Sequence, residues 1–214
     1  MSNSEISRKK RIVLIGASVG KAWDFPGLPG RMADNRFIFE YVGKYQFDKS
    51  EVLEEIFERK SNKADAVILK ECAAYFPSDL SFDQAKSLMR TWINDCLDHN
   101  ILPILTTIVP VTPAHDERFK THNLIKRLIK RILGISMVSR MDRIIEYNDW
   151  IKEHSRDKGL AVLDLESPLR VSDERRYLKE EYTKGDGLHL NRQAYAELDT
   201  IVIPLLDQVK FLVK

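Results

Sequence analysis

Two short segments near opposite ends of the chain hold the side chains that nucleophilic catalysis requires. Ser18 follows an apolar run near the start, and Asp186 and His189 stand three residues apart near the end. A hydroxyl group becomes a nucleophile when a base takes its proton, and a carboxylate fixes the tautomer of that base. The residue types predict a triad with Ser18 as nucleophile, His189 as base and Asp186 as orienting carboxylate.

The segment Lys184–Asn191 has the composition that this role needs. Its two glycines allow backbone conformations that other residues avoid, so Leu188 can point inward while Asp186 and His189 point the other way. Asp186 can then accept a hydrogen bond from one imidazole nitrogen and leave the other free to take a proton. On this segment alone, a turn that caps the next helix beside an exposed histidine explains the residues equally well.

Ser18 stands just beyond the first predicted strand, where Gly16 permits a tight turn and a helix can begin. Its hydroxyl would lie near a helix N-terminus, whose amide groups stabilise a developing oxyanion. An alternative is that Ser18 only caps this helix, because serine is a preferred capping residue.

A second alternative is a phosphate-binding loop, because Gly16, Gly20 and Lys21 resemble the pattern G-x-x-x-x-G-K-[ST]. However, the first glycine is one residue too close to the second, and Ala22 lacks the hydroxyl that holds magnesium. A nucleotide-binding enzyme would also leave the later aspartate and histidine without a use.

Apolar, β-branched runs alternate with amphipathic segments along the chain. The runs are predicted strands, and the amphipathic segments carry apolar residues at helical spacing. This alternation predicts an α/β fold, a three-layer sandwich of about five parallel strands with helices on both faces. The predicted strands cover residues 11–15, 36–41, 66–69, 102–108 and 160–163, and the predicted helices cover residues 49–59, 81–99, 117–133, 139–158 and 191–209.

The longest irregular segments, at 21–34, 109–116 and 166–187, all follow predicted strands. Ligands of open α/β sheets bind beyond the carboxyl ends of the strands, so a site is expected there. Residues 23–30 either form an acyl or leaving-group pocket or pack onto the domain. His115 and His122 are predicted to be solvated loop histidines rather than metal ligands.

Length and composition predict an ordinary soluble domain. We expect a flexible segment at residues 1–10 and a single domain at 11–214. The formal charge is only +2, from 34 basic and 32 acidic residues, so no nucleic-acid partner is expected.

The apolar run 12–15 is too short for a membrane span or a secretory leader. Segment 123–133 is basic and amphipathic, and we expect its apolar stripe to pack on the sheet rather than on a membrane.

The two cysteines, Cys72 and Cys96, are predicted to be reduced thiols, and Cys72 is expected to be buried and inert. Together with the missing leader, they lead us to expect a cytoplasmic protein.

With these motifs in this order, the chain resembles the SGNH (GDSL-type) hydrolase family. Gly16-Ala17-Ser18 matches the serine motif after the first strand, although Ala17 stands where an aspartate is usual, and Asp186–Asn191 matches the D-x-x-H motif. The resemblance implies a flavodoxin-like fold and a serine esterase or acetylhydrolase that cleaves carboxylic esters through an acyl-enzyme. It implies no metal and no organic cofactor, and a small-molecule, carbohydrate or lipid ester as substrate.

The family's oxyanion hole uses a glycine after the second strand and an asparagine after the third. Gly43 is placed for the first of these donors, beside the amide of Ser18. After the third predicted strand the chain has no asparagine, and Ala74 falls where it is expected. Losing one such donor costs roughly 10²- to 10³-fold in rate. We predict that this segment binds the substrate through Glu71, Cys72, Ala74 and Tyr75.

Glu71 cannot donate to an oxyanion while it is ionised. It either makes a structural hydrogen bond or contacts a cationic or hydroxylic substrate. The missing asparagine also keeps open a binding or structural protein with this fold and no hydrolase activity. An esterase, a non-hydrolytic SGNH-fold protein and a nucleotide-binding enzyme are thus the three functions that the sequence allows.

Overall fold

The computed structural model describes residues 8–75, 82–122 and 139–211. Within these ranges, five parallel strands form one sheet in the order β2-β1-β3-β4-β5. This arrangement confirms the predicted α/β class and the parallel sheet. The strands are β1 (Lys10–Gly16), β2 (Phe37–Gly43), β3 (Ala66–Leu69), β4 (Leu102–Thr106) and β5 (Ala161–Leu163).

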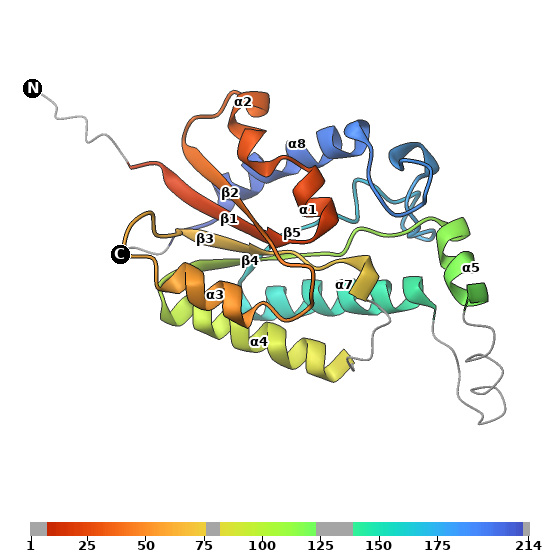
Figure 1. The fold of residues 1–214 in the computed structure, drawn as a ribbon, viewed down its shortest axis with the longest axis horizontal. Coiled ribbons are helices and arrows are strands. Elements are labelled where there is room, and N and C mark those ends of the chain that lie inside the picture. Colours follow the sequence, from red (N-terminus) through yellow and green to blue (C-terminus); the bar gives the residue numbers. More distant parts are fainter. Residues whose placement is uncertain (1–7, 76–81, 123–138, 212–214) are drawn as a thin grey trace, which may run out of the picture.

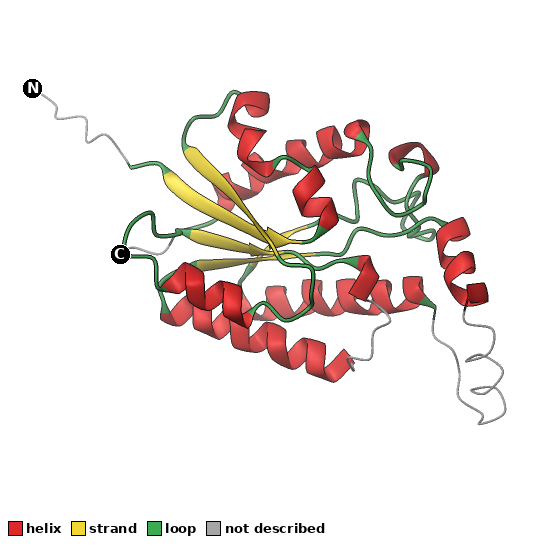
Figure 2. Ribbon diagram, in the orientation of Figure 1, coloured by secondary structure: helices red, strands yellow, loops and turns green. Residues whose placement is uncertain are grey.

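Helices lie on both faces of the sheet. They are α1 (Ser18–Ala22), α2 (Leu28–Met32), α3 (Ser50–Phe57), α4 (Phe82–Asp98), α5 (Pro113–His122), α7 (Arg140–Lys158) and α8 (Arg192–Gln208), with 3₁₀ turns at Phe25–Gly27, Ala73–Tyr75 and Glu180–Tyr182. Figures 1 and 2 show α1, α2 and α8 on one face and α3, α4 and α7 on the other, while α5 lies beyond the carboxyl ends of the strands. The result is the predicted three-layer sandwich.

The strands are apolar because they are buried on both sides. Ile12 and Leu14 of β1 pack with residues of α8, and Val13 and Ile15 pack with residues of α4. All four side chains are fully buried. A strand covered on both faces has a continuous apolar sequence instead of an alternating one, which is typical of parallel sheets.

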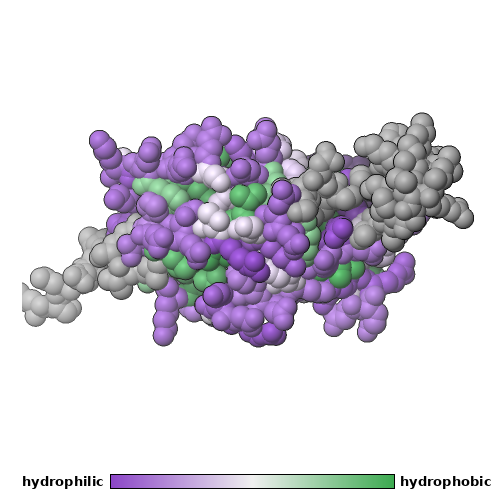
Figure 3. Space-filling view, turned by 90° about the horizontal axis from the view of Figure 1, so that it is seen from below, coloured by the Kyte–Doolittle hydropathy of each residue, from purple (hydrophilic) through white to green (hydrophobic). Residues whose placement is uncertain are grey.

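The helices turn their polar faces outward. Figure 3 shows the molecule from the side of α3, α4 and α7, where hydrophilic residues cover most of the surface. Met89 and Trp92 of α4 are fully buried against the sheet, whereas Arg90 and Thr91 between them are exposed. None of the helices in the described ranges is long and apolar enough to cross a membrane.

Helix starts follow local capping chemistry. Helix α7 begins at Arg140 because Ser139 caps it: the Asp142 N–H donates to Ser139 Oγ at 2.9 Å, and the Ser139 N–H donates to the Asp142 carboxylate at 3.1 Å. Helix α5 begins at Pro113, earlier than predicted, because proline favours the first turn of a helix.

Four other predictions differ from the structure or lie outside its described part. Segment 21–34 was expected to be irregular but contains the end of α1 and the whole of α2. Strand β4 ends at Thr106, before its predicted end. The basic segment 123–133 and most of the expected flexible segment 1–10 lie outside the described residues.

The strand order creates a crevice at the end of β1. From β1 the chain crosses to β2 on one side and then to β3 on the other side. The segments that follow β1 and β3 therefore diverge at the carboxyl edge of the sheet, where open α/β sheets bind ligands. Ser18 follows β1 and the segment Lys70–Tyr75 follows β3, so both lie at this crevice.

Asp199 joins α8 to the segment that follows β1. Its carboxylate accepts the indole N–H of Trp23 at 2.8 Å and two N–H groups of Arg31 at 2.6 and 3.1 Å. The Trp23 ring is buried and stacks on Tyr195 with centroids 6.4 Å apart. These contacts hold α8, and the loop before it, against α1 and α2.

Replacing Asp199 with Ala should lower the free energy of unfolding by about 2–3 kcal/mol, because the buried indole N–H of Trp23 loses a charged acceptor. Urea titration followed by tryptophan fluorescence measures the loss. Asp207→Ala is the matched control, since Asp207 lies on the same helix and pairs with Arg36 at the surface. The control should lose less than about 1 kcal/mol, and equal losses in both variants would contradict this role for Asp199.

Candidate active site

Ser18 is the first residue of α1, directly beyond the end of β1. Ala17 holds the N-cap position, and no side chain caps this helix. The alternative that Ser18 serves only as a cap is therefore wrong. Its side chain is partly exposed at the crevice beside β1.

Tyr41 holds the turn that carries Ser18. Its hydroxyl donates to the carbonyl oxygens of Gly16 and Ala17, at 2.9 and 3.2 Å. Burial, followed by the neighbouring Tyr45, raises the pKa of Tyr41, so the hydroxyl keeps its proton. A Cβ atom at Gly20 would lie 3.1 Å from the Tyr41 ring. Packing against Tyr41 thus explains this glycine without any bound phosphate.

Asp186 and His189 are joined by a short hydrogen bond, with His189 Nδ1 2.6 Å from Asp186 Oδ2. The other carboxylate oxygen accepts the backbone N–H groups of Leu188 and His189, at 2.9 and 2.8 Å. Burial raises the pKa of Asp186, but these hydrogen bonds outweigh it and lower the pKa to about 2. The carboxylate is ionised at neutral pH and accepts the N–H of His189 Nδ1, which leaves Nε2 outside this hydrogen bond.

Gly187 lets this loop dock on the segment after β4. It has a φ of +75°, and a Cβ atom there would overlap the Thr112 side chain and approach His115 Cβ to 2.9 Å. The Thr112 N–H donates to the Gly187 carbonyl at 3.0 Å. Leu188 packs on the core, as its predicted anchor role requires. The site therefore needs glycine here for both backbone conformation and close approach.

His115 is not a solvated loop residue, and the sequence-based expectation for it is wrong. It lies in α5, is half-buried and has hydrogen-bond partners at both ring nitrogens. His115 Nδ1 lies 3.0 Å from the Asp186 carbonyl oxygen, and His115 Nε2 lies 2.8 Å from Arg140 Nη1. The side chain of the other histidine, His122, lies outside the described part.

Tyr195 connects the two halves of the candidate triad. Its hydroxyl donates to the carbonyl of Val19 at 3.1 Å, which ties the start of α8 to α1. Ser18 and the Asp186–His189 loop are thereby held at the same edge of the sheet. Among the described residues, no hydrogen bond joins the Ser18 hydroxyl to His189.

Gly43 ends β2 beside the end of β1. The parallel register pairs it directly with Gly16, and the next N–H group, of Lys44, donates to the Gly16 carbonyl at 2.9 Å. Gly43 is exposed. Its backbone therefore lies at the crevice, next to the turn that carries Ser18.

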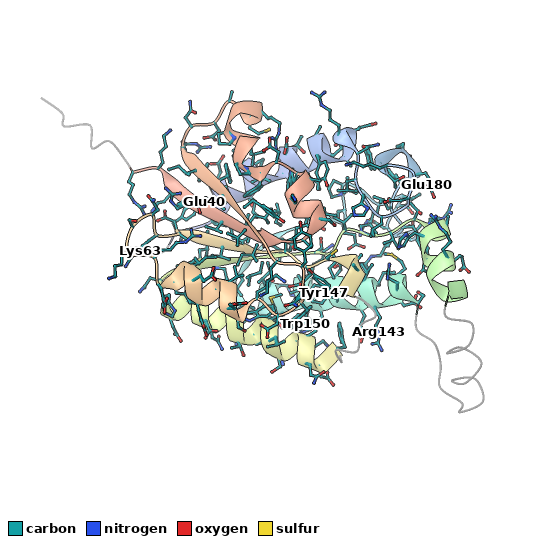
Figure 4. The ribbon with its side chains drawn as sticks, in the orientation of Figure 1. Glu40, Lys63, Arg143, Tyr147, Trp150 and Glu180 are labelled. Atoms are coloured by element: carbon teal, nitrogen blue, oxygen red, sulfur yellow. The ribbon has the colours of Figure 1, made fainter. Side chains whose placement is uncertain are left out.

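The first half of the segment after β3 is buried. Glu71 is fully buried and forms an ion pair with Lys49, which is also fully buried. Lys49 Nζ lies 5.3 Å from the centroid of the Trp92 ring. Tyr147, labelled below the sheet in Figure 4, approaches from α7, and burial, followed by the charge of Glu71, raises its pKa. These buried surroundings favour a structural role for Glu71 over contact with a substrate.

The second half of the same segment reaches the surface. Cys72 is buried, and neither it nor Cys96 is in a disulfide, as predicted. Ala74 is exposed, and Tyr75 is half-buried with its hydroxyl donating to the Lys44 carbonyl at 3.1 Å. Alanine offers no side-chain donor at the position where the family has asparagine.

A cavity of about 550 Å³ opens between α1, α2 and α8, and Ser18, Asp186 and His189 are not among its lining residues. Trp23 and Asp24 of the predicted pocket segment line it. Lys184 and Arg192 also line it, and they flank the loop that carries Asp186 and His189. The remaining lining residues are Ala22, Arg31, Met32, Tyr195, Ala196 and Asp199.

Sequence patterns did not single out four residues that shape the site, namely Tyr41, Lys49, Thr112 and Arg140. Each acts on a group distant in the sequence, so no local motif marks it. For two of them, position along the chain was the available signal: Tyr41 lies near the carboxyl end of β2, the strand next to β1, and Thr112 follows β4 at the same edge.

The whole architecture matches solved hydrolases at low sequence identity. A GDSL-like lipase from Bacteroides thetaiotaomicron has a TM-score of 0.65 and 18% identity over 93% of this chain and 88% of that chain. A lipase/acylhydrolase from Enterococcus faecalis has a TM-score of 0.65 and 16% identity, over 96% and 100%. A psychrotrophic esterase from Pseudoalteromonas, inhibited by monoethylphosphonate, has a TM-score of 0.61 and 9% identity, over 94% and 98%.

No protein-family model and no curated protein sequence matches the chain. The structural matches and the strand order establish the fold of the SGNH (GDSL-type) hydrolases, which the sequence motifs predicted. A fold of this kind hosts more than one function, so the activity depends on the residues of the site.

The carboxylate of Asp186 should stabilise the folded state in a pH-dependent way. Because its folded pKa is about 2, below the ordinary value of 3.8, this stability is present above pH 3.8 and is lost as the pH falls toward 2. Asp186→Asn should therefore be less stable than the wild type at neutral pH, and the difference should shrink below pH 3.8. Urea titrations at neutral pH and below pH 3.8 measure this difference in the free energy of unfolding.

Asp173→Asn is the control variant for this comparison, because 82% of the Asp173 side chain is exposed. A stability difference for Asp186→Asn that stays constant on acidification would contradict the assigned hydrogen bonding of the carboxylate.

Proposed function

We propose that this protein is a serine hydrolase that cleaves carboxylic esters through an acyl-enzyme. The observation that carries the proposal is the 2.6 Å hydrogen bond from His189 Nδ1 to an ionised Asp186, at the sheet edge where Ser18 begins α1. A base oriented in this way and a partly exposed hydroxyl at a helix start are the parts that acyl transfer requires.

In the proposed reaction, His189 Nε2 takes the proton of Ser18 as Oγ attacks the ester carbonyl carbon. The proton then passes from His189 to the leaving alcohol oxygen as the carbon–oxygen ester bond breaks, which leaves an acyl group on Ser18. Water attacks this acyl group and gives its proton to His189, and the proton returns to Ser18 as the acid departs. Asp186 stabilises the imidazolium in both steps.

The backbone N–H groups of Ser18 and Gly43 are the proposed oxyanion donors. Gly43 is paired in register with Gly16 and is exposed at the crevice, which supports this assignment. Preorganised backbone donors of this kind stabilise the charge that develops in the transition state. Glu71 and Cys72 are proposed to fix the shape of the facing segment, and Ala74 and Tyr75 to contact the substrate.

We further propose that the cavity lined by Trp23 and Arg192 receives the acyl or alcohol part of the substrate. Its volume, about 550 Å³, lies in the range of small-molecule pockets. The structural likeness to lipases, acylhydrolases and an esterase agrees with an ester substrate. We expect the protein to act in the cytoplasm on a small-molecule, carbohydrate or lipid ester.

Replacing Ser18 with Ala should abolish hydrolysis of short p-nitrophenyl esters, with kcat falling by at least about 10⁴-fold. The loss should occur without unfolding, as measured by circular dichroism. Ser87→Ala is the matched control, because Ser87 is exposed on α4, on the opposite face of the sheet from α1. It should keep wild-type turnover.

Unchanged turnover in Ser18→Ala would end the nucleophile assignment. A wild-type protein that hydrolyses none of these esters would favour the non-hydrolytic alternative, a binding or structural protein with the same fold.

A further inference from the structure

We propose that His115 is a positioning residue that holds the Asp186–His189 loop in its working geometry, and that it does so in its neutral form. The catalytic meaning of this role rests on the hydrolase function proposed above. The hydrogen bonds that define the role are properties of the fold and can be tested separately from hydrolysis.

His115 bridges a buried cation and the backbone of the triad carboxylate. Arg140, of which 9% is exposed, places Nη1 2.8 Å from His115 Nε2. On the other side of the ring, His115 Nδ1 lies 3.0 Å from the carbonyl oxygen of Asp186. The contact therefore runs from α7 through the α5 side chain to the loop before α8.

The chemistry of these two partners fixes one protonation state of His115. A guanidinium carries only N–H donors, so Nε2 must accept and carries no proton. A carbonyl oxygen only accepts, so Nδ1 must carry the proton. The ring is therefore neutral, with its hydrogen on Nδ1.

A second proton would disrupt this arrangement. It would replace the acceptor lone pair at Nε2 with an N–H that faces the Arg140 guanidinium, with like charges 2.8 Å apart. Arginine does not relieve the clash by losing its own proton, because it stays charged. In acid the Arg140–His115 contact should break, and the ring should leave the Asp186 carbonyl.

Other charged groups surround His115. From its own helix, Arg118 Nη2 also donates to the Asp186 carbonyl, at 3.1 Å, and the buried Asp116 attracts Arg140. From the triad loop come the Asp186 carboxylate and the ring of His189. Cys72 also lies close to Arg140. Arg140 is the charge in direct hydrogen-bond contact with the ring.

Movement of His115 is transmitted to the loop by packing. A Cβ atom at Gly187 would lie 2.9 Å from His115 Cβ, so the loop backbone rests directly on this residue. The Asp186 carbonyl that His115 holds belongs to the residue whose carboxylate orients His189. A small displacement of this loop changes the alignment on which proton transfer depends.

Two variants of His115 separate the effect of its hydrogen-bond donor from the effect of its protonation. His115→Asn places an amide N–H near the position of Nδ1 and does not titrate, whereas His115→Phe fills the space without any hydrogen bond. His99→Asn is the matched control, because His99 is exposed just beyond the end of α4, where its Nδ1 contacts the Asp95 carbonyl oxygen and its ring stacks on Phe57.

Steady-state kinetics across the acid range give the first test. His115→Phe should lower kcat by about tenfold to a hundredfold with little change in KM, because the loop is displaced while the binding cavity is kept. His115→Asn should restore most of kcat at neutral pH. Its profile should keep the acid-side loss that protonation of the base His189 causes in every variant, but lack the additional loss that the wild type and His99→Asn share. Wild-type kcat in His115→Phe, or the same acid profile in His115→Asn as in the wild type, would overturn the proposal.

Proton NMR gives a test that needs no hydrolysis. The proton between His189 Nδ1 and Asp186 should give a strongly deshielded resonance, assigned by its loss in His189→Gln. It should persist in His115→Asn, shift or broaden in His115→Phe, and disappear at higher pH in the wild type than in His115→Asn. Identical behaviour in all three proteins would refute the positioning role.

If the wild type hydrolyses no ester, the proposed function fails, and the resonance alone decides the role of His115. If His115→Phe does not fold, the pH dependence of the resonance in His115→Asn decides it.

Discussion

The carboxyl end of β1 lies between β2 and β3, and the candidate site depends on this arrangement. The parallel registers pair Gly16 with Gly43 and Ile15 with Leu69, so the residues that follow the three strands emerge side by side, with about 4.8 Å between neighbouring strands. Ser18, Gly43 and the segment after β3 meet there because the chain reverses its direction of winding at β1. Tyr195 then fastens the start of α8, and with it the Asp186–His189 loop, to α1.

Polar contacts orient the loops at this edge. Asp199 holds Trp23 and Arg31, Lys49 pairs with Glu71, and a buried Arg140 reaches the Asp186–His189 loop through His115. Such buried charged groups add little net stability, because desolvation offsets their attraction. Removing one partner is costly, since the other remains buried and unsatisfied. We interpret these contacts as devices that select one arrangement of the loops around Ser18, while the apolar layers supply most of the stability.

The sequence predicted what local chemistry determines. Apolar runs such as residues 66–69 predicted the parallel strands. The residue types at Ser18, Asp186 and His189 predicted which side chains form the candidate site. The short helix α2 was missed because its Leu-Pro-Gly sequence resembles a loop. The contacts of His115 were missed because its partners, Arg140 and Asp186, lie 25 and 71 residues away along the chain. Only the folded chain brings such groups together.

Ser18 is proposed to be an activated nucleophile, and labelling with a fluorophosphonate probe tests this proposal. Such probes react covalently with a serine hydroxyl that a neighbouring base deprotonates. Intact-mass and peptide mass spectrometry should show one label per chain, on Ser18, with none in Ser18→Ala and strongly slowed labelling in His189→Gln. A folded wild-type protein that remains unlabelled, or that carries the label on another residue, would contradict the account.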